Sequence, residues 1–451
     1  MSELPKGWVQ TKFTDTLDVN GGTQPPKSEF IDEPKEGYIR LLQIRDFGKK
    51  PVPTYIPDNG KRRICKKEDV LIGRYGASIG RVCTGMEGAF NVALARVAKP
   101  EEINSGYLKH FLESHLFQDP LSMLSRSAQN GFNKQDLAEF NFPLAPENEQ
   151  IRIADKLDSI LAKVDAAQAR LDKIPKILKR FRQSVLAAAT SGELTKEWRG
   201  KNKISFNDDW NERAIKDITL KSFDGPFGSK LKTVDYTTEG VKVVRLENIG
   251  HLKFLSHKET FVSEEKFSEL KKHQIEHNDV LFSSFVDENI RVCLFDIKYG
   301  TYINKADCFC LRPDESKVVP EFLSYFLASR KTYEEAKKQV HGATRPRINL
   351  KFLKTLTLYI PSLLEQKEVV RRIELLFSDA EKVEQKYLRI KDHTNRLTQS
   401  ILAKAFRGEL VPQCESDESA EVLLAKVKAI SDDAAIKKKT TSKIKKKTEA
   451  A

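Results

Sequence analysis

The chain has 451 residues, with 77 Lys and Arg against 64 Asp and Glu, a formal charge of +13 and a mean hydropathy of −0.48. At roughly 100–200 residues per domain, this length predicts two to four domains. No run of about 18 apolar residues is present to cross a membrane, and the first residues lack the apolar core of a signal peptide. We therefore expect a soluble, cytoplasmic protein with no membrane contact. Six cysteines without a CxxC pair predict neither a disulfide framework nor a zinc site.

The positive charge is unevenly distributed along the chain. Residues 1–149 are neutral, with 20 basic and 20 acidic side chains, whereas 150–200, 201–365 and 366–451 carry +5, +3 and +5. Seven lysines lie in the run KKKTTSKIKKK at 437–447. A run of like charge without apolar periodicity predicts a disordered tail, which either solubilises the chain or adds non-specific affinity for phosphate.

In chain order, short β-like runs separated by Gly, Pro and Asn turns come first, and a similar set opens the second half. These runs are 38–44, 69–72, 241–246 and 279–282. Each set is followed by a long segment with helical periodicity, at 150–189 and at 366–405. The chain is therefore expected to alternate between mixed domains and long helices.

The two halves of the chain also match in sequence. QSVLAAATSGEL at 183–194 matches QSILAKAFRGEL at 399–410, and the EQ pairs at 149–150 and 365–366 share the same offset of 216. A repeat that spans almost the whole chain predicts two copies of one structural unit.

Apolar residues recur with 4,3 spacing in both long segments, each of 40 residues, which predicts rods of roughly 60 Å. Such heptad seams favour a coiled coil between the two helices; the alternative is that each stripe packs on its own globular domain. Pro175 should kink or break the first helix near Ile174. The large seam residues are Leu157, Ile160, Val164, Leu171, Leu178 and Phe181, then Ile373, Leu376, Val383, Tyr387, Ile390 and Leu397.

Two motifs imitate catalytic sites. HQIEH at 273–277 spells the inverted zincin pattern, which needs both histidines on one helical face, but a β-like run follows it at once. Asp314 with Glu335 and Lys337 loosely matches the PD…ExK arrangement of Mg²⁺-dependent nucleases, but the first copy has no counterpart. No phosphate-binding glycine loop and no adenine-methyltransferase motif occurs. We therefore predict no catalytic residue and no metal site.

The order of elements, with EQ opening each helix and GEL closing it, resembles the specificity (S) subunit of type I restriction-modification systems, most like the IA subgroup. The resemblance covers roughly residues 1–412. Its most specific motifs are PLAPENEQ at 143–150, IPKILKRFRQS at 174–184 and LTQSILAKAFRGEL at 397–410.

This resemblance implies an α+β fold. Two mixed α/β target-recognition domains are expected in a pseudo-two-fold arrangement, separated by two long antiparallel helices that form a coiled coil. The expected divisions are 1–147 for recognition domain 1, 148–200 for helical spacer 1, 201–363 for recognition domain 2, 364–412 for helical spacer 2, and 413–451 for a short helix and a disordered Lys-rich tail. Residues 420–427 would form that short helix and dock on a partner.

The resemblance also implies a function without catalysis. Each domain would read one half of an asymmetric, bipartite target in double-stranded DNA, and the helices would set the gap. Two modification subunits, using S-adenosylmethionine, would methylate adenine there, and two restriction subunits would translocate and cut DNA with ATP and Mg²⁺. The chain itself would hold no cofactor. The alternatives are a coiled-coil scaffold with non-specific DNA affinity, and a nuclease that uses Glu335.

The DNA-contacting residues follow from residue chemistry, because recognition domains vary with their target. No acidic residue lies between Glu335 and Glu365, and the arginines on either side of Pro346 could reach guanine in the major groove. For each candidate the alternative is a solvated surface charge. The candidates are Lys61, Arg62, Arg63, Arg74, Tyr75, Lys230, Arg345, Arg347 and Lys351.

Overall fold

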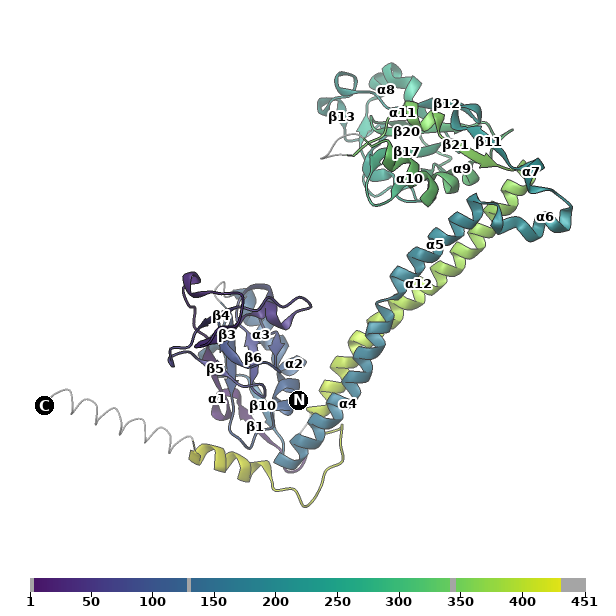
Figure 1. Ribbon diagram of the computed structural model, residues 1–451. Helices are drawn as coiled ribbons and strands as arrows, with labels where there is room; N and C mark the ends of the chain where they lie inside the picture. Colours follow the sequence, from purple (N-terminus) through teal and green to yellow (C-terminus); the bar gives the residue numbers. More distant parts are fainter. Residues whose placement is uncertain (1–3, 128–130, 341–345, 431–451) are drawn as a thin grey trace. The chain divides into compact units, whose positions relative to one another are not determined.

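The computed structural model describes residues 4–127, 131–340 and 346–430 (Figure 1). The chain forms two compact units: unit 1 comprises Met1–Leu171 with Arg389–Ala451, and unit 2 comprises Asp172–Leu388. Within the described ranges, no helix combines the length and apolarity that crossing a membrane requires. The lysine-rich run at 437–447 lies outside the described residues.

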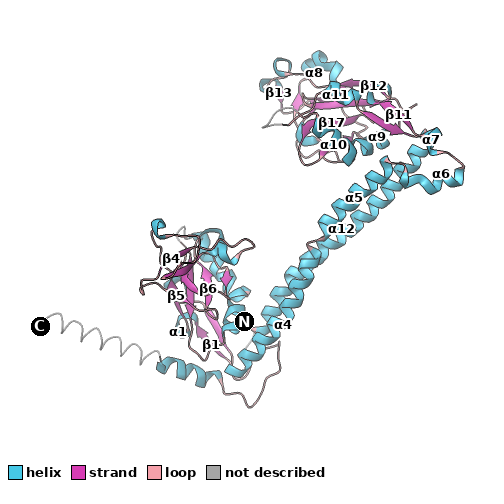
Figure 2. Cartoon of the chain, viewed as in Figure 1, coloured by secondary structure: helices cyan, strands magenta, loops and turns pink. Residues whose placement is uncertain are grey.

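Unit 1 is a mixed α/β domain, with strands and helices interleaved along the chain (Figure 2). One four-stranded antiparallel sheet has the order β2-β9-β6-β7, a second has the order β4-β3-β8-β5, and β1 pairs with β10. The strands are β1 (Val9–Lys12), β2 (Asp18–Gly21), β3 (Tyr38–Leu42), β4 (Tyr55–Pro57), β5 (Ile64–Cys65), β6 (Val70–Gly73), β7 (Val82–Cys83), β8 (Gly88–Phe90), β9 (Leu94–Ala98) and β10 (Asn141–Leu144). The helices are α1 (Phe13–Thr16), α2 (Ser105–Glu113), α3 (His115–Ser127) and α4 (Glu147–Leu171).

Unit 2 repeats this plan with one added edge strand. Its sheets have the orders β12-β20-β17-β18 and β13-β15-β14-β19-β16, and β11 pairs with β21. The strands are β11 (Asn211–Ala214), β12 (Thr219–Phe223), β13 (Tyr236–Thr237), β14 (Val241–Val244), β15 (Phe261–Val262), β16 (Gln274–Ile275), β17 (Val280–Val286), β18 (Ile290–Leu294), β19 (Tyr302–Asn304), β20 (Cys308–Pro313) and β21 (Thr357–Ile360). The helices are α5 (Ile174–Thr190), α6 (Lys196–Asn202), α7 (Phe206–Asp209), α8 (Glu264–Leu270), α9 (Pro320–Leu327), α10 (Arg330–Lys338), α11 (Leu350–Thr355) and α12 (Leu363–Ala405), whose last residues belong to unit 1.

The strand registers confirm the internal repeat residue by residue. Leu71 pairs with Cys83 in unit 1, and Leu281 pairs with Cys293 in unit 2. In both units the second sheet contains one parallel pair, β3–β8 and β14–β19, among antiparallel neighbours. The same connections and registers recur although the side chains have diverged.

The EQ motif that opens each long helix is buried in both copies. The Gln150 amide donates to Ala145 O at 2.8 Å and accepts from the Asn104 N–H at 2.9 Å; Gln366 makes the equivalent bonds at 2.9 and 2.8 Å. These bonds satisfy backbone groups where a strand passes into a helix, and buried polar groups need such partners. The motif is therefore structural.

The glutamates of the motif accept hydrogen bonds from matched tryptophans. Trp8 Nε1 donates to Glu149 at 2.9 Å, and Trp210 Nε1 donates to Glu365 at 3.1 Å. Burial raises the pKa of Glu149. Each tryptophan thereby ties the first strand of its domain to the helix that closes it.

The first long helix breaks where Pro175 predicts. Helix α4 ends at Leu171 and α5 begins at Ile174, which places Pro175 in the first turn of α5, where its missing N–H costs nothing. Within unit 2, α5 and α12 run antiparallel, because Arg182 contacts Glu384 at 2.7 Å whereas the later Leu194 accepts from Arg372 at 2.7 Å. The antiparallel long helices are confirmed.

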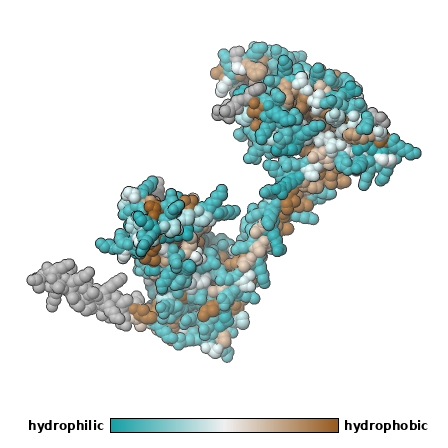
Figure 3. All heavy atoms as spheres, viewed as in Figure 1, coloured by the Kyte–Doolittle hydropathy of each residue, from teal (hydrophilic) through white to brown (hydrophobic). Residues whose placement is uncertain are grey.

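The seam between these helices differs from the prediction on one flank. Leu157, Leu178, Ile373 and Tyr387 are buried, and Ile160, Val164, Leu171 and Leu376 are half-buried. The remaining four, Phe181, Val383, Ile390 and Leu397, are exposed by 39%, 46%, 50% and 39%. Apolar residues are visible along the surface of the long helices, in brown in Figure 3.

The exposure of these four side chains has a geometric cause. From the buried anchors Ala380, Tyr387 and Thr394, a 4,3 seam can continue through the residue three or four positions on, and apolarity favours the residue three positions on. The structure takes the residue four positions on, which half-buries Glu384, Lys391 and Thr398 instead. The pair between Arg182 and Glu384 shows that this flank is polar.

The end of the chain completes the core of unit 1. Phe406 lies 5.1 Å from the Tyr107 ring and 5.8 Å from the Phe111 ring, edge to face in both cases. Residues 420–430 form the predicted short helix, but Ala420 and Leu423 join this same core. The helix thus packs on the core of its own unit, while Val422 and Ile430 stay exposed, and docking on a partner stays a prediction.

Candidate nucleic-acid interface

Three of the candidate residues, Arg74, Tyr75 and Arg347, lie near the matching ends of β6 and β17 in the two units. The Arg74 N–H donates to Ala93 O at 2.9 Å, and the Ser284 N–H donates to Asp307 O at 2.9 Å. Since Gly73 pairs with Leu94 and Ser283 pairs with Cys308 in the strands just before, Arg74 and Ser284 occupy the same position of the repeat. The next residue is aromatic in both units: Tyr75 and Phe285.

A second loop faces this strand end in each unit. This loop contains Gly131 in unit 1 and Arg347 in unit 2, two positions that differ by the repeat offset of 216. In both loops an asparagine lies two residues further on and accepts a hydrogen bond from a backbone N–H of the next turn. Arg347 forms an antiparallel bridge with Phe285. At Gly131, with φ +77°, a Cβ would lie 2.3 Å from Arg74 O and 2.6 Å from the Tyr75 ring, so that only glycine fits.

Two predicted arginines meet the aromatic rings at these strand ends. The Arg74 guanidinium lies 5.1 Å from the Tyr75 ring centroid, and it donates to Phe132 O from Nε at 3.3 Å and from Nη2 at 3.2 Å. The Arg347 guanidinium lies 5.1 Å from the Phe285 ring and 3.6 Å from an Asp307 oxygen. Both distances to the rings are within the range of a cation–π contact.

Of the other candidates in unit 1, one forms an ion pair with a carboxylate of the described residues and two do not. Arg62 forms an ion pair with Glu29, and Arg63 donates to Gly21 O beside the Arg74 guanidinium. Lys61 is exposed, and among the described residues neither Lys61 nor Arg63 contacts a carboxylate. Cations without a carboxylate partner suit the phosphate contacts that most protein–DNA hydrogen bonds make.

In unit 2, Lys230 and Lys351 are exposed, and Arg345 lies outside the described residues. Sequence reasoning missed Lys305, whose ammonium lies 5.0 Å from the Tyr236 ring and contacts its hydroxyl. Lys305 follows β19 directly and is bonded through its N–H to Val244 O, as Asn91 is to Leu42 O in unit 1. Aligning the two copies strand by strand places Lys305 at the position of Asn91.

A half-buried carboxyl, that of Asp224, lies near the arginine loop of unit 2. Burial and the nearby Asp307 raise the pKa of Asp224 from 3.8 to about 6, against the opposing hydrogen bond from the Gly225 N–H. The Asp224 carbonyl also contacts His273 Nδ1 at 2.8 Å. Its charged form is therefore unfavourable in the folded unit.

Asp224 predicts a pH dependence of stability. The folded-state pKa lies above the unfolded value, so the free energy of unfolding should fall as pH rises from about 4 to about 6 and stay lower above that. Asp224→Asn should remove the penalty and stabilise unit 2 by about 1–2 kcal/mol at pH 7.5, since solvent screens part of it, and by nothing near pH 4. Urea unfolding at the two pH values measures this; the exposed Asp296→Asn is the control. An equal gain at both pH values would contradict the assignment.

The catalytic look-alikes do not assemble. His273 ends a 3-10 turn and β16 follows at Gln274, so the two histidines of HQIEH do not share a helical face. Asp314 pairs locally with Lys317 at 2.9 Å, and Glu335 pairs with Lys338 at 2.7 Å. Within the described ranges, no three His, Cys, Asp or Glu side chains gather as a metal site would require.

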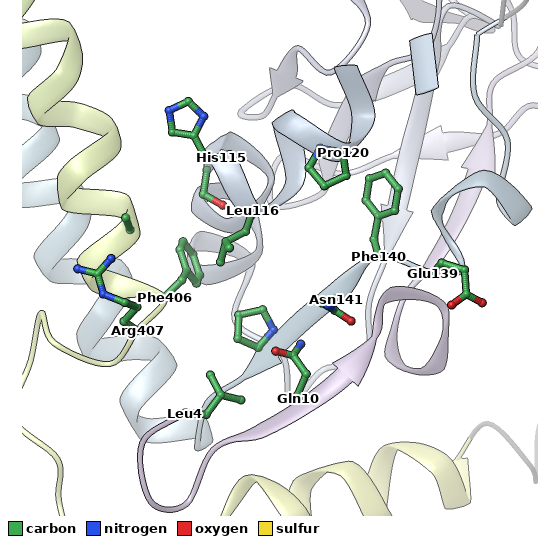
Figure 4. A pocket seen from close by; sticks show the side chains of 13 residues that line it. Leu4, Gln10, His115, Leu116, Pro120, Glu139, Phe140, Asn141, Phe406 and Arg407 are labelled. Carbon is green, nitrogen blue, oxygen red and sulfur yellow. The ribbon is translucent and has the colours of Figure 1, made fainter. Parts of the chain in front are cut away.

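Unit 1 also contains a cavity of about 510 Å³ (Figure 4). Leu116, Pro120, Phe140 and Phe406 supply an apolar lining, and the charged Glu139 and Arg407 lie at its edges. None of the predicted DNA-contacting residues lines it. It therefore adds no chemistry to the arginine loops.

The two-copy architecture of the chain agrees with that of the proteins it is similar to in sequence. Residues 5–176 and 207–391 match the family model of the type I restriction modification DNA specificity domain, so the chain belongs to this family, with the domain present twice. It is 30% identical to the specificity subunit of the type I restriction enzyme EcoKI from Escherichia coli strain K12, over 95% of this chain and 96% of that one. It is 30% identical to the EcoBI specificity subunit of Escherichia coli, over 94% and 92%.

Solved structures share the fold at lower identity. A chain from a structure of the type I R-M system described for its complex assembly and conformational transition matches with a TM-score of 0.67 and 16% identity, over 91% of this chain and 100% of that one. The HsdS subunit from Thermoanaerobacter tengcongensis matches with a TM-score of 0.54 and 17% identity, over 90% and 98%. The arrangement of mixed domains and long helices is therefore that of known specificity subunits.

Proposed function

We propose that this chain selects the DNA target of a type I restriction-modification complex. Each mixed α/β domain reads one half of a bipartite sequence, and the long helices set the gap between the halves. The observation that carries this is the repeated backbone geometry at the ends of β6 and β17. The Arg74 and Ser284 N–H groups make equivalent hydrogen bonds there, whereas the side chains at these positions differ. Two copies of one reading unit engage two half-sites, as dimeric repressors do.

Divergence of the side chains makes the target asymmetric. Position 74 carries arginine in one copy and the equivalent position 284 carries serine, while position 131 is glycine and position 347 is arginine. Base edges in the major groove are distinguished by such donors and acceptors. The two half-sites therefore differ in sequence.

The chemistry belongs to partners in this proposal. Two modification subunits methylate adenine with S-adenosylmethionine, and two restriction subunits use ATP and Mg²⁺ to translocate and cleave. This chain contributes no catalytic residue and no cofactor; the local ion pairs of Asp314 and Glu335 support that assignment.

Domain exchange tests the function. Replacing residues 1–147 with the corresponding domain of another family member, in a host that also expresses the modification subunits, should change one half of the methylated target and leave the other half and the gap unchanged. Sequencing of methylated adenines measures both. A target that survives the exchange unchanged would refute the proposal, and methylation without sequence preference would favour a scaffold that binds DNA non-specifically.

A further inference from the structure

Each unit places one guanidinium on one aromatic ring at the same point of the repeat. The separation is 5.1 Å for Arg74 over Tyr75 and 5.1 Å for Arg347 over Phe285. The rings are equivalent, because each follows the residue whose N–H bonds to the loop before β9 or β20. The ring position is therefore shared by the two units, and each ring has a guanidinium over it.

The arginine belongs to a different backbone position in each of the two units. In unit 1 it belongs to the strand end, and the facing loop carries Gly131, where a Cβ would clash with the Tyr75 ring. In unit 2 the strand end carries Ser284, and the facing loop supplies Arg347. At this strand end, each unit therefore has a guanidinium over the equivalent ring, supplied from alternative backbone positions.

We propose, on the basis of the proposed function, that these two stacked arginines determine specificity by contacting guanine in the major groove, one in each half-site. Guanine O6 and N7 accept two parallel N–H bonds from the fork of an arginine, the commonest specific contact to a base. A ring beneath the guanidinium fixes its plane and lowers the entropy lost on contact. A phosphate contact needs no such plane.

The remaining contacts leave the forks usable. Arg74 spends Nε and one Nη2 donor on Phe132 O, so its end-on edge, formed by Nη1 and Nη2, keeps N–H groups. Arg347 has a side chain 49% exposed, and its 3.6 Å approach to Asp307 is longer than a hydrogen bond. Because the two arginines start from different backbone positions, the guanines they read occupy non-equivalent positions in the half-sites.

The test uses the full chain, co-expressed with its modification subunits, and sequencing of methylated adenines. Arg347→Ala should lower the preference for guanine at one position of one half-site about 10-fold or more, and Arg74→Ser should do so in the other half-site. Serine is the residue that unit 2 already holds at this position, so the frame tolerates it. Arg347→Lys should relax the same position, since an ammonium lacks the planar fork.

The matched control is Lys331→Ala on α10, because the exposed Lys331 also lies over a ring, at 5.1 Å from Tyr359 of β21. It should leave both half-sites unchanged. If Arg347→Ala lowers methylation of all sites equally while Arg347→Lys restores it, the residue contacts phosphate and the inference is overturned. Unchanged specificity in both arginine variants also overturns it. A parent complex without any sequence preference would instead refute the proposed function.

Discussion

Glu365→Ala is expected to destabilise unit 2 by about 3–5 kcal/mol. Glu365 is fully buried and accepts hydrogen bonds from Trp210, Thr195 and Arg199. Arg199 is itself only 7% exposed, and its guanidinium also stacks on Phe206 and Trp210. Removing the carboxylate leaves an uncompensated buried cation, which costs far more than the pair contributes.

Urea unfolding, followed by the fluorescence of Trp210, measures this effect. Arg199→Met with Glu365→Leu is the informative second variant, because apolar replacement of both members of a buried pair is often neutral or stabilising. The double variant should recover most of the loss. A single variant that loses less than about 1 kcal/mol would mean that water reaches this cluster.

Glu149→Ala in unit 1 is the matched comparison. Glu149 occupies the same position of the repeat, but its partners are the neutral Trp8 and Gln413, at 2.9 and 2.7 Å, and the nearby Arg152 pairs with Asp417 at 2.6 Å. Removing the Glu149 carboxylate leaves no buried cation without a partner. The free energy of unfolding should therefore fall by only about 1–2 kcal/mol. An effect as large as that of Glu365→Ala would contradict this account.

Phe406→Ala should destabilise unit 1 by about 3–5 kcal/mol, as large-to-small changes of buried phenylalanines do. The ring is 2% exposed and lies edge to face with Tyr107 and Phe111, so that its loss opens a cavity between α2 and the end of α12. Thermal unfolding of the full chain measures the change. Phe181→Ala, on an exposed ring of α5, is the control and should change stability by less than about 1 kcal/mol.

Truncation extends the same prediction. A chain that stops at residue 419 retains Phe406 but loses Leu423 and Val427, both nearly fully buried. At about 1.5–3 kcal/mol for each buried side chain, unit 1 should lose several kcal/mol, whereas unit 2 should unfold as before. Loss of unit 2 together with unit 1 would contradict the independence of the two cores.

The repeat, the long helices and the break at Pro175 could be predicted from sequence because each depends on local or periodic signals. The exposed flank of the seam could not, since Ile390 and Lys391 both satisfy a heptad and the choice depends on the facing helix. The ion pair of Arg62 also could not be predicted, because its partner Glu29 is 33 residues away in the sequence. Long-range partners of this kind leave no trace in one sequence.

The arginine–aromatic pairs illustrate the same limit. Arg74 and Tyr75 are neighbours in sequence, and their proximity is visible at once. Arg347 and Phe285 are joined only by the bridge between two distant segments. The equivalence of Phe285 to Tyr75 becomes apparent when the two units are aligned by their backbone hydrogen bonds and not by their amino-acid sequences.

The discontinuous core of unit 1 has a consequence for synthesis on the ribosome. Unit 2 is complete when Leu388 emerges, but unit 1 still awaits Phe406 and the helix at 420–430. At 5–20 residues per second, that interval lasts roughly 2–8 s. The domain whose synthesis begins first therefore completes its core last, once the helix at 420–430 has been made.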